Sequence, residues 1–295
     1  MLSRQSVHFF SLPVILRHRV GVLLFSLQML TFVSFGAAQS LTSPVPLQFS
    51  VIDASAPLPE APLPQVADSA GGGTGDSDKV TLRKVPMNFL RDQEAIWTSP
   101  VRIREDNFLL PAALVLGTTL TISVDHQIMS SSRLNDASLN SHAETASNGL
   151  LGGFVAAPAI IYGLGYIHHD DHATETGILA GEAMVDSLVV NEVMKAVSMR
   201  ERPTVDNAKG RFFQSSVGTG SSFASTHSII AWSSAAVIAS EYDGPMTQLT
   251  AYGLATGVSL TRVLARQHFP SDVLVGSAVG WLIGRYVVHK HRKFF

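Results

Sequence analysis

Long apolar runs separated by short polar segments make up most of the chain after residue 107. There are six of them, over residues 108–124, 150–167, 178–197, 228–239, 249–264 and 273–288. Each run is long enough for a helix, glycine or proline stands at several boundaries, and none shows the strict alternation typical of a strand. The pattern predicts an all-α fold, a six-helix bundle, with the polar stretch 125–148 as a loop between the first two helices.

The first 78 residues predict two segments of a different kind. Basic residues at positions 4, 17 and 19 precede an apolar stretch over 20–35, which ends in Gly36, Ala37 and Ala38. This order is typical of an export signal over residues 1–38, cleaved after Ala38, and it also fits an uncleaved N-terminal anchor. Residues 39–78 are rich in Pro, Ala, Gly and Ser, and we expect them to form a disordered linker.

Residues 79–106 form an amphipathic segment that leads into the helical domain, residues 107–295. The segment mixes basic residues with apolar ones such as Leu90, Ile96 and Trp97. Two interpretations stay open. The segment either lies on a membrane surface, as helices with Trp and Arg do, or packs across the bundle as a helix of its own.

Composition narrows the class of protein. The chain has 295 residues, of which 46% are hydrophobic and only 15% are charged, which fits a large helical core with membrane contact. A formal net charge of −2 and the lack of a basic stripe argue against nucleic acid as a partner. Because the chain has no cysteine, disulfides and a lipidated cysteine are excluded. The sequence does not indicate an oligomeric state.

Three spaced fragments carry the candidate chemistry. They are K-x6-R-P from Lys195 to Pro203, S-F-A-S-T-H from Ser222 to His227, and T-R-x5-H-x3-D from Thr261 to Asp272. Lys195, Arg202 and Arg262 supply enough donors to surround a tetrahedral oxyanion. Ser225 and Thr226 precede an apolar run, so we expect them at a helix N-terminus, where free N–H groups favour an anion. Together these residues predict a phosphate site.

Two histidines in these fragments suit phosphoryl transfer. A covalent route needs one nitrogen nucleophile and one proton donor for the leaving oxygen, and His268 and His227 can divide these roles. Asp272 lies four residues after His268, where it could accept a hydrogen bond from the other imidazole nitrogen and stabilise positive charge. Taken singly, residues such as Arg200 and Arg202 are typical of a solvated helix end. The order and spacing of all three fragments favour the functional interpretation.

The fragments resemble the signature of the type 2 phosphatidic acid phosphatase superfamily, which is K-x6-R-P, P-S-G-H and S-R-x5-H-x3-D. The resemblance covers roughly residues 175–290 and implies a helical-bundle phosphatase that works without a metal or other cofactor. It implies that His268 attacks phosphorus, Asp272 orients His268, and His227 protonates the departing alcohol. The implied phosphate-binding residues are Lys195, Arg202, Arg262, Ser225 and Thr226.

Three positions depart from this signature: Ala224 replaces Pro, Thr226 replaces Gly, and Thr261 replaces Ser. The second departure matters most, because glycine lets the backbone approach a ligand closely and tolerates positive φ, whereas a β-branched residue does not. Slower or narrower activity is expected from it.

The resemblance implies a phosphomonoesterase or diphosphatase that acts through a phosphohistidine intermediate, on a lipid or isoprenoid phosphate if membrane helices frame the site. Three alternatives stay open. They are a periplasmic non-specific acid phosphatase, a vanadium-dependent haloperoxidase, and a weakly active phosphate- or lipid-binding envelope protein.

Two further groups of polar residues attract attention. The cluster His168, His169, Asp170, Asp171 and His172 lacks a recognised ligand spacing, so we interpret it as a polar loop leading into a helix and not as a metal site. Glu182, Asp186 and Glu192 recur with mixed spacing along one run. They are interpreted as a polar helix face, or as partners for the basic residues.

The membrane placement depends on opposing observations. Runs 108–124 and 150–167 are apolar enough to span a bilayer, but run 178–197 carries four charged residues, which are costly in lipid. Both flanks of the helical domain are basic, whereas the stretch 125–148 has a single arginine, so the positive-inside rule puts the flanks in the cytoplasm. We expect an envelope protein, exported or membrane-associated, with its site facing the periplasm. Whether the helices span the bilayer stays open.

Overall fold

The computed structural model describes residues 80–103, 108–216 and 220–292, and this part of the chain is all-α, without strands. The predicted signal and linker, residues 1–38 and 39–78, lie outside the described residues. Seven helices are present in the described part: α2 (Val85–Thr98), α3 (Leu109–Met129), α4 (Ala137–His168), α5 (Asp171–Ser198), α6 (Thr226–Glu241), α7 (Pro245–Leu264) and α8 (Pro270–His291). The six apolar runs correspond to α3–α8, and α2 is an additional helix within the segment 79–106.

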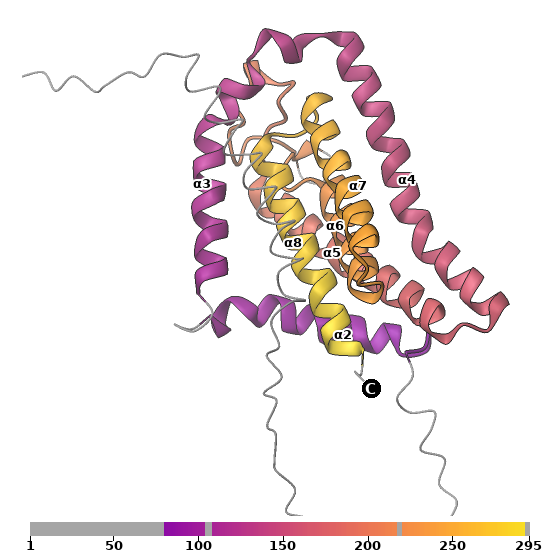
Figure 1. Cartoon of the computed structure of the whole chain (residues 1–295). Helices are drawn as coiled ribbons and strands as arrows, with labels where there is room; N and C mark the ends of the chain where they lie inside the picture. Colours follow the sequence, from indigo (N-terminus) through magenta and orange to yellow (C-terminus); the bar gives the residue numbers. More distant parts are fainter. Residues whose placement is uncertain (1–79, 104–107, 217–219, 293–295) are drawn as a thin grey trace, which may run out of the picture.

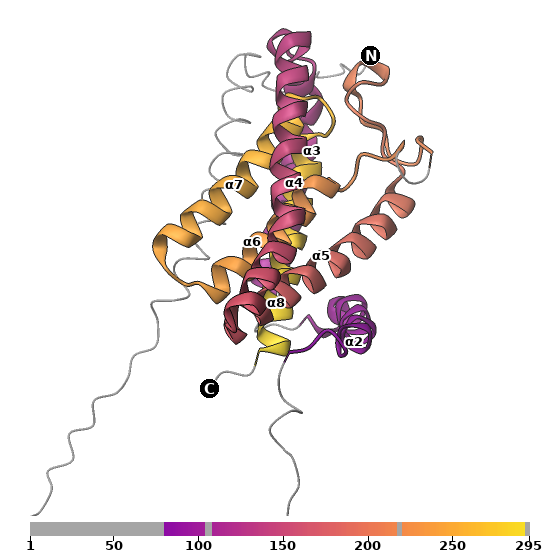
Figure 2. The same cartoon turned by 90° about the vertical axis from the view of Figure 1, so that its right-hand side faces the viewer.

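Helices α3 to α8 run alternately up and down (Figure 1). The connections 130–136, 199–225 and 265–269 therefore gather at one end of the bundle, the loop end. Helix α2 and the C-terminus of α8 lie at the opposite end, the α2 end, which Figure 2 shows from the side. Side chains confirm this pairing, because His291 Nε2 in α8 lies 2.6 Å from Asp92 Oδ2 in α2.

The expectation of a loop over residues 125–148 is wrong. Helix α3 continues to Met129, and α4 already begins at Ala137, where the Asp136 carboxylate caps it by accepting a hydrogen bond from Leu139 N at 2.9 Å. The first turns of α4 bury only small residues, Ala143 and Ser147, one turn apart. Such a narrow stripe does not stand out in a pattern of large apolar residues, which is why the sequence did not indicate a helix here.

A glycine stripe on α8 brings it unusually close to α6. A Cβ atom at Gly276, Gly280 or Gly284 would overlap a backbone carbonyl oxygen of α6 or of its N-cap, namely that of Ser225, Ile229 or Ser233. Small residues at such spacing allow two helix backbones to approach. The contact holds the start of α6 beside the start of α8, and Ser225 N donates to the carbonyl of Asp272 at 3.2 Å.

Three helices, α3, α4 and α8, are long and apolar enough to cross a membrane. Only 17% of the apolar window of α3 or α4 is buried inside the protein, against 78% for α8, so α3 and α4 present apolar faces outward. In α5, the costly charges Glu182, Asp186 and Lys195 are buried in the bundle, while apolar residues such as Val185 and Val197 are exposed. The arrangement is consistent with membrane association.

Helix α2 lies across the end of the bundle (Figures 1 and 2). It buries Asp92 completely and leaves Met87, Leu90 and Trp97 exposed on its other side. Helix α2, within the segment 79–106, thus packs on the bundle and also offers an apolar surface outward.

Candidate active site

The three fragments meet at the loop end of the bundle. Lys195 is in the last turn of α5, Arg202 is in the connection 199–225, and Arg262 is in the last turn of α7. His227 is in the first turn of α6, and His268 directly precedes α8. Lys195, Arg202, Arg262 and His268 all interact electrostatically with the His227 imidazole. The fold therefore brings the basic residues and both histidines into one site.

His268 is buried, and its surroundings select one tautomer. Its Nδ1 lies 2.7 Å from the carbonyl oxygen of Ser222, which can only accept, so Nδ1–H is the donor. The lone pair is then on Nε2, where a nucleophile needs it. Burial is the main cause that lowers the pKa of His268, which keeps the free imidazole neutral.

Asp272 lies beside His268 but is not the nearest acceptor of its proton. The distance from Nδ1 to Asp272 Oδ2 is 3.8 Å, so the carboxylate acts on the imidazole mainly through its charge. The same oxygen accepts a hydrogen bond from Phe269 N at 2.8 Å and thereby caps α8. The helix start fixes Asp272 in the site.

Arg200 is a site residue that sequence reasoning missed. It is 1% exposed, and its guanidinium donates to Asp272 Oδ1 at 2.7 Å and to Asp125 Oδ2 at 2.8 Å. Its Nε donates to the carbonyl of Gly210, and its plane stacks 4.2 Å from the ring centroid of Phe269. Arg200 thus joins α3, the connection 199–225 and the start of α8. The interpretation of this stretch as a solvated helix end does not apply to Arg200.

Arg262 has buried nitrogens that are not hydrogen-bonded to any described residue. Its side chain is almost fully buried, yet its Nε and one terminal nitrogen have no hydrogen-bond partner among the described residues. Burial, followed by the charge of Arg202, lowers the pKa of Arg262 to about 10. Buried donors without partners are costly, and an anion between these cations would satisfy them.

Lys195 and Arg202, the other two basic residues predicted for the site, each have a partner within the protein. Lys195 Nζ lies 3.3 Å from Glu192 Oε1, as expected for a partner of the basic residues. An Arg202 terminal nitrogen donates to the carbonyl of Gln267 at 3.0 Å, which holds it beside His268.

His227 is half-buried, and its Nε2 lies 3.0 Å from Asn148 Oδ1 in α4. Burial, followed by the charge of Arg262, lowers the pKa of His227 to about 3. The imidazole is therefore neutral before an anion arrives, and negative charge in the site would raise its proton affinity. Asn148 is a second missed residue, because it lies in the stretch interpreted as a loop.

Ser225 and Thr226 form the helix N-terminus predicted for them. Ser225 is the N-cap of α6, and its hydroxyl accepts a hydrogen bond from Ser228 N at 3.4 Å. Thr226 is the first helical residue, and its Oγ1 accepts from Asn191 Nδ2 at 2.9 Å. Thr226 is not among the residues with positive φ, so the conformational objection to threonine at this position does not apply. Thr261 uses its hydroxyl within α7, donating to the Gly257 carbonyl at 2.7 Å.

The remaining polar residues lie away from this site. Asp170 caps α5 by accepting a hydrogen bond from Ala173 N at 3.0 Å, and His172 pairs with Glu241 at 3.0 Å. Glu182 and Asp186 form a buried polar face of α5 that lies against α2, so they are not partners of the basic site.

The model of the PAP2 superfamily matches residues 176–295, a range that holds all eight predicted site residues. Comparison with curated proteins and with solved structures gives no match. Members of the PAP2 superfamily are phosphatases or haloperoxidases, which agrees with a buried imidazole, that of His268, near the unpartnered guanidinium nitrogens of Arg262. The C-terminal region of this chain, residues 176–295, belongs to the PAP2 superfamily.

Proposed function

We propose that the protein is a metal-independent phosphatase that hydrolyses a phosphomonoester or diphosphate of a lipid or isoprenoid through a phosphohistidine intermediate. The observation that carries the proposal is Arg262, whose buried donors lack a partner in the part of the chain that the structure describes. A phosphoryl group there would be bound by Arg262, with Arg202 and Lys195 close by. The free Nε2 of His268 would then face phosphorus.

In the first step, the lone pair of His268 Nε2 forms the N–P bond while the bond from phosphorus to the leaving oxygen breaks; this oxygen belongs to the alcohol of a monoester or to the remaining phosphate of a diphosphate. The Ser222 carbonyl and the charge of Asp272 stabilise the positive imidazole that results. His227, which gains a proton when the anion enters, gives it to the leaving oxygen. In the second step, His227 takes a proton from water, the water oxygen attacks phosphorus, and His268 leaves with inorganic phosphate as product.

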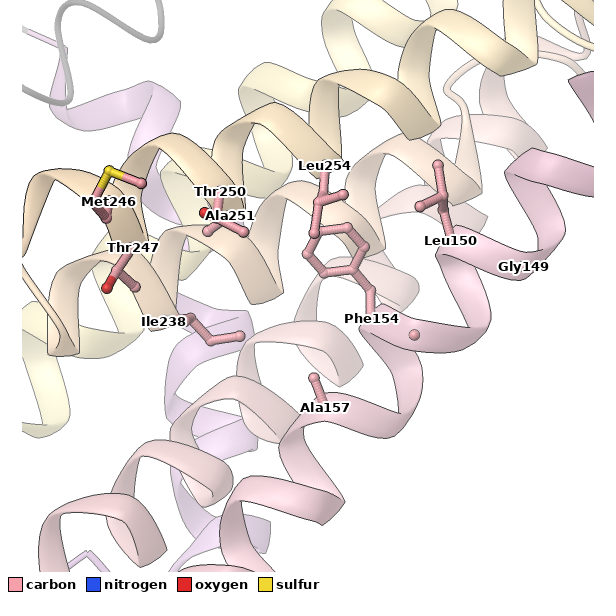
Figure 3. A pocket seen from close by; sticks show the side chains of 11 residues that line it. Gly149, Leu150, Phe154, Ala157, Ile238, Met246, Thr247, Thr250, Ala251 and Leu254 are labelled. Carbon is pink, nitrogen blue, oxygen red and sulfur yellow. The ribbon is translucent and has the colours of Figure 1, made fainter.

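An apolar groove beside the site supports a lipid substrate. It has a volume of about 610 Å³ and is lined by α4, α6 and α7, with Phe154, Ile238 and Leu254 among its walls (Figure 3). The groove begins at Gly149, next to the Asn148 that contacts His227. Leu254 precedes Arg262 by eight residues on α7, a rise of roughly 12 Å. A hydrocarbon chain attached to a bound phosphate would therefore have an apolar surface within reach.

Filling the groove tests the lipid substrate. We expect Leu254→Trp to lower kcat/KM for a long-chain isoprenyl diphosphate about tenfold or more, because the ring blocks the space for the chain. Turnover of para-nitrophenyl phosphate, which has no chain, should be unchanged. Leu249→Trp is the matched control, since Leu249 is exposed on the same helix and does not line the groove. Equal effects of Leu254→Trp on both substrates would contradict this role of the groove.

His227→Ala tests the proton donor. The variant should lose much more activity on alkyl phosphates than on para-nitrophenyl phosphate, because a poor leaving group needs the proton and nitrophenolate does not. A loss on the order of 10²-fold is expected for the alkyl substrate. The measurement is kcat of the variant and of the wild type for both substrates. Equal losses on the two substrates would contradict the role of His227 as the proton donor.

We also propose an envelope location with the site facing the periplasm. Helix α2, which follows Arg83 and Lys84, and the basic C-terminus share the α2 end, and the site is at the loop end. Basic flanks favour the cytoplasmic side. Because the chain has no cysteine, a single cysteine at exposed Lys209 can be labelled from outside intact cells. Labelling only after lysis would contradict the orientation.

A further inference from the structure

A second group of titratable residues lies at the α2 end, far from the phosphate site. It comprises Asp92 of α2, Glu182 of α5 and His291 of α8, and one ligand atom of each lies within 4.8 Å of the others. His291 follows His268 by 23 residues, most of them along α8, which corresponds to roughly 35 Å. The two sites are therefore separate.

The group is buried and acidic. Asp92 is fully buried, Glu182 is 2% exposed, and the side chain of His291 is 12% exposed. One turn along α5, Asp186 adds a further fully buried carboxylate. Three carboxylates thus face one imidazole at this place. Buried negative charge of this kind requires a compensating positive charge or protonation.

Hydrogen bonds satisfy Asp92 more fully than Glu182. Asp92 Oδ2 lies 2.6 Å from His291 Nε2, and Asp92 Oδ1 accepts from the Tyr286 hydroxyl at 3.0 Å. Neither carboxylate oxygen of Glu182 has a hydrogen bond of normal length and geometry within the described ranges, although the side chain of Asn88 interacts with this carboxylate. Gln93 Nε2 donates to Asp186 Oδ1 at 2.9 Å, and Asp186 Oδ2 has no partner in those ranges either. Orphaned oxygens beside an imidazole nitrogen are what a cation would satisfy.

We propose that Asp92, Glu182 and His291 bind a divalent metal ion of the Zn²⁺ class. An imidazole nitrogen with carboxylate oxygens suits Zn²⁺, whereas Mg²⁺ and Ca²⁺ prefer sites made of oxygen alone. Binding through Nε2 of His291 moves the proton of this nitrogen to Nδ1 or to solvent, because a ligating nitrogen must be unprotonated. Asp186, or water, completes the coordination.

Such an ion would fasten α2 to the bundle. Its ligands come from three helices and are 90 and 109 residues apart, from 92 to 182 and from 182 to 291. An ion bound only to the folded protein stabilises it by mass action. The site is therefore structural and independent of the proposed phosphatase, whose nucleophile is at the other end.

Metal binding is tested on the full chain, purified in detergent without a histidine tag and stripped with EDTA. Titration with Zn²⁺ in a calorimeter should give one ion per chain, and Zn²⁺ at 100 times its Kd should raise the Tm by several degrees. Mg²⁺ and Ca²⁺ should have much smaller effects. Absence of Zn²⁺ binding by the wild-type chain would overturn the proposal.

Variants assign the ligands. Glu182→Gln keeps the shape of the side chain but removes the charge, and it should lower Zn²⁺ affinity tenfold or more, as should His291→Ala. His172→Ala is the matched control, since it removes another histidine that contacts a buried carboxylate, that of Glu241. His268→Ala should also bind Zn²⁺ as the wild type does. Unchanged binding in Glu182→Gln, or lost binding in His172→Ala, would place the ion elsewhere and overturn the assignment.

Discussion

His268→Ala is expected to lower phosphate release by about 10⁴-fold or more, because it removes the nitrogen that would form the covalent intermediate. The measurement is inorganic phosphate released from para-nitrophenyl phosphate and from a long-chain isoprenyl diphosphate by the detergent-purified protein. The assay contains EDTA. It is run at a temperature at which circular dichroism shows that the protein is folded. Release in EDTA that disappears in the variant would support a histidine phosphatase that needs no metal for the reaction.

His142→Ala is the control for this experiment, because His142 is exposed on α4 and bonds within its own helix. It should behave as the wild type does. Substantial turnover by His268→Ala would contradict the role of His268 as the nucleophile. If the wild type releases no phosphate but oxidises bromide with peroxide when vanadate is added, the haloperoxidase alternative replaces the phosphatase. Phosphate binding without either activity would instead favour a binding protein.

Arg200→Ala is expected to destabilise the protein by about 3–5 kcal/mol, because it leaves two buried carboxylates without their counter-charge. Asp125 and Asp272 both lose a short hydrogen bond to the guanidinium, and both are almost fully buried. The free energy of unfolding is measured by chemical denaturation in detergent. Activity should fall as well, since Asp272 sits beside His268.

Arg211→Ala is the matched control for Arg200→Ala. Its side chain is 55% exposed and pairs with Glu201 at 3.1 Å and with Asp206 at 3.0 Å, so a smaller loss of stability than for Arg200→Ala is expected. Arg200→Ala combined with Asp125→Asn should cost less than the sum of the two single changes, because the residues share one interaction. Equal stability of Arg200→Ala and Arg211→Ala would show that the buried network is not needed for folding.

Local patterns in the sequence were sufficient to predict most of α3 to α8 and the candidate chemistry. Six apolar runs predicted α3 to α8, because a buried helix requires apolar residues at regular positions close together in the sequence. Three fragments predicted the candidate site. Each fragment lies at the end of a helix, and its residues have the spacing of the superfamily signature. The superfamily match over residues 176–295 confirms the resemblance drawn from these fragments.

Weak patterns failed where burial involves few or small residues. The start of α4 buries Ala143 and Ser147, which hydropathy does not distinguish from a polar loop. Arg200 is charged, and charged residues are usually on the surface. It can be buried because Asp125 of α3 lies beside it and supplies an opposite charge. A sequence pattern records the residue's own polarity, not the partner that permits its burial.

The sequence by itself thus determined the all-α class, the superfamily of residues 176–295 and the residue types of the candidate phosphate site. Tertiary structure alone decided which distant groups meet. It placed the Ser222 carbonyl on His268 Nδ1, left Arg262 without a partner among the described residues, and gathered Asp92, Glu182 and His291 at the opposite end. The physical reason is that helix formation depends on near neighbours, whereas these contacts depend on the direction and packing of whole helices.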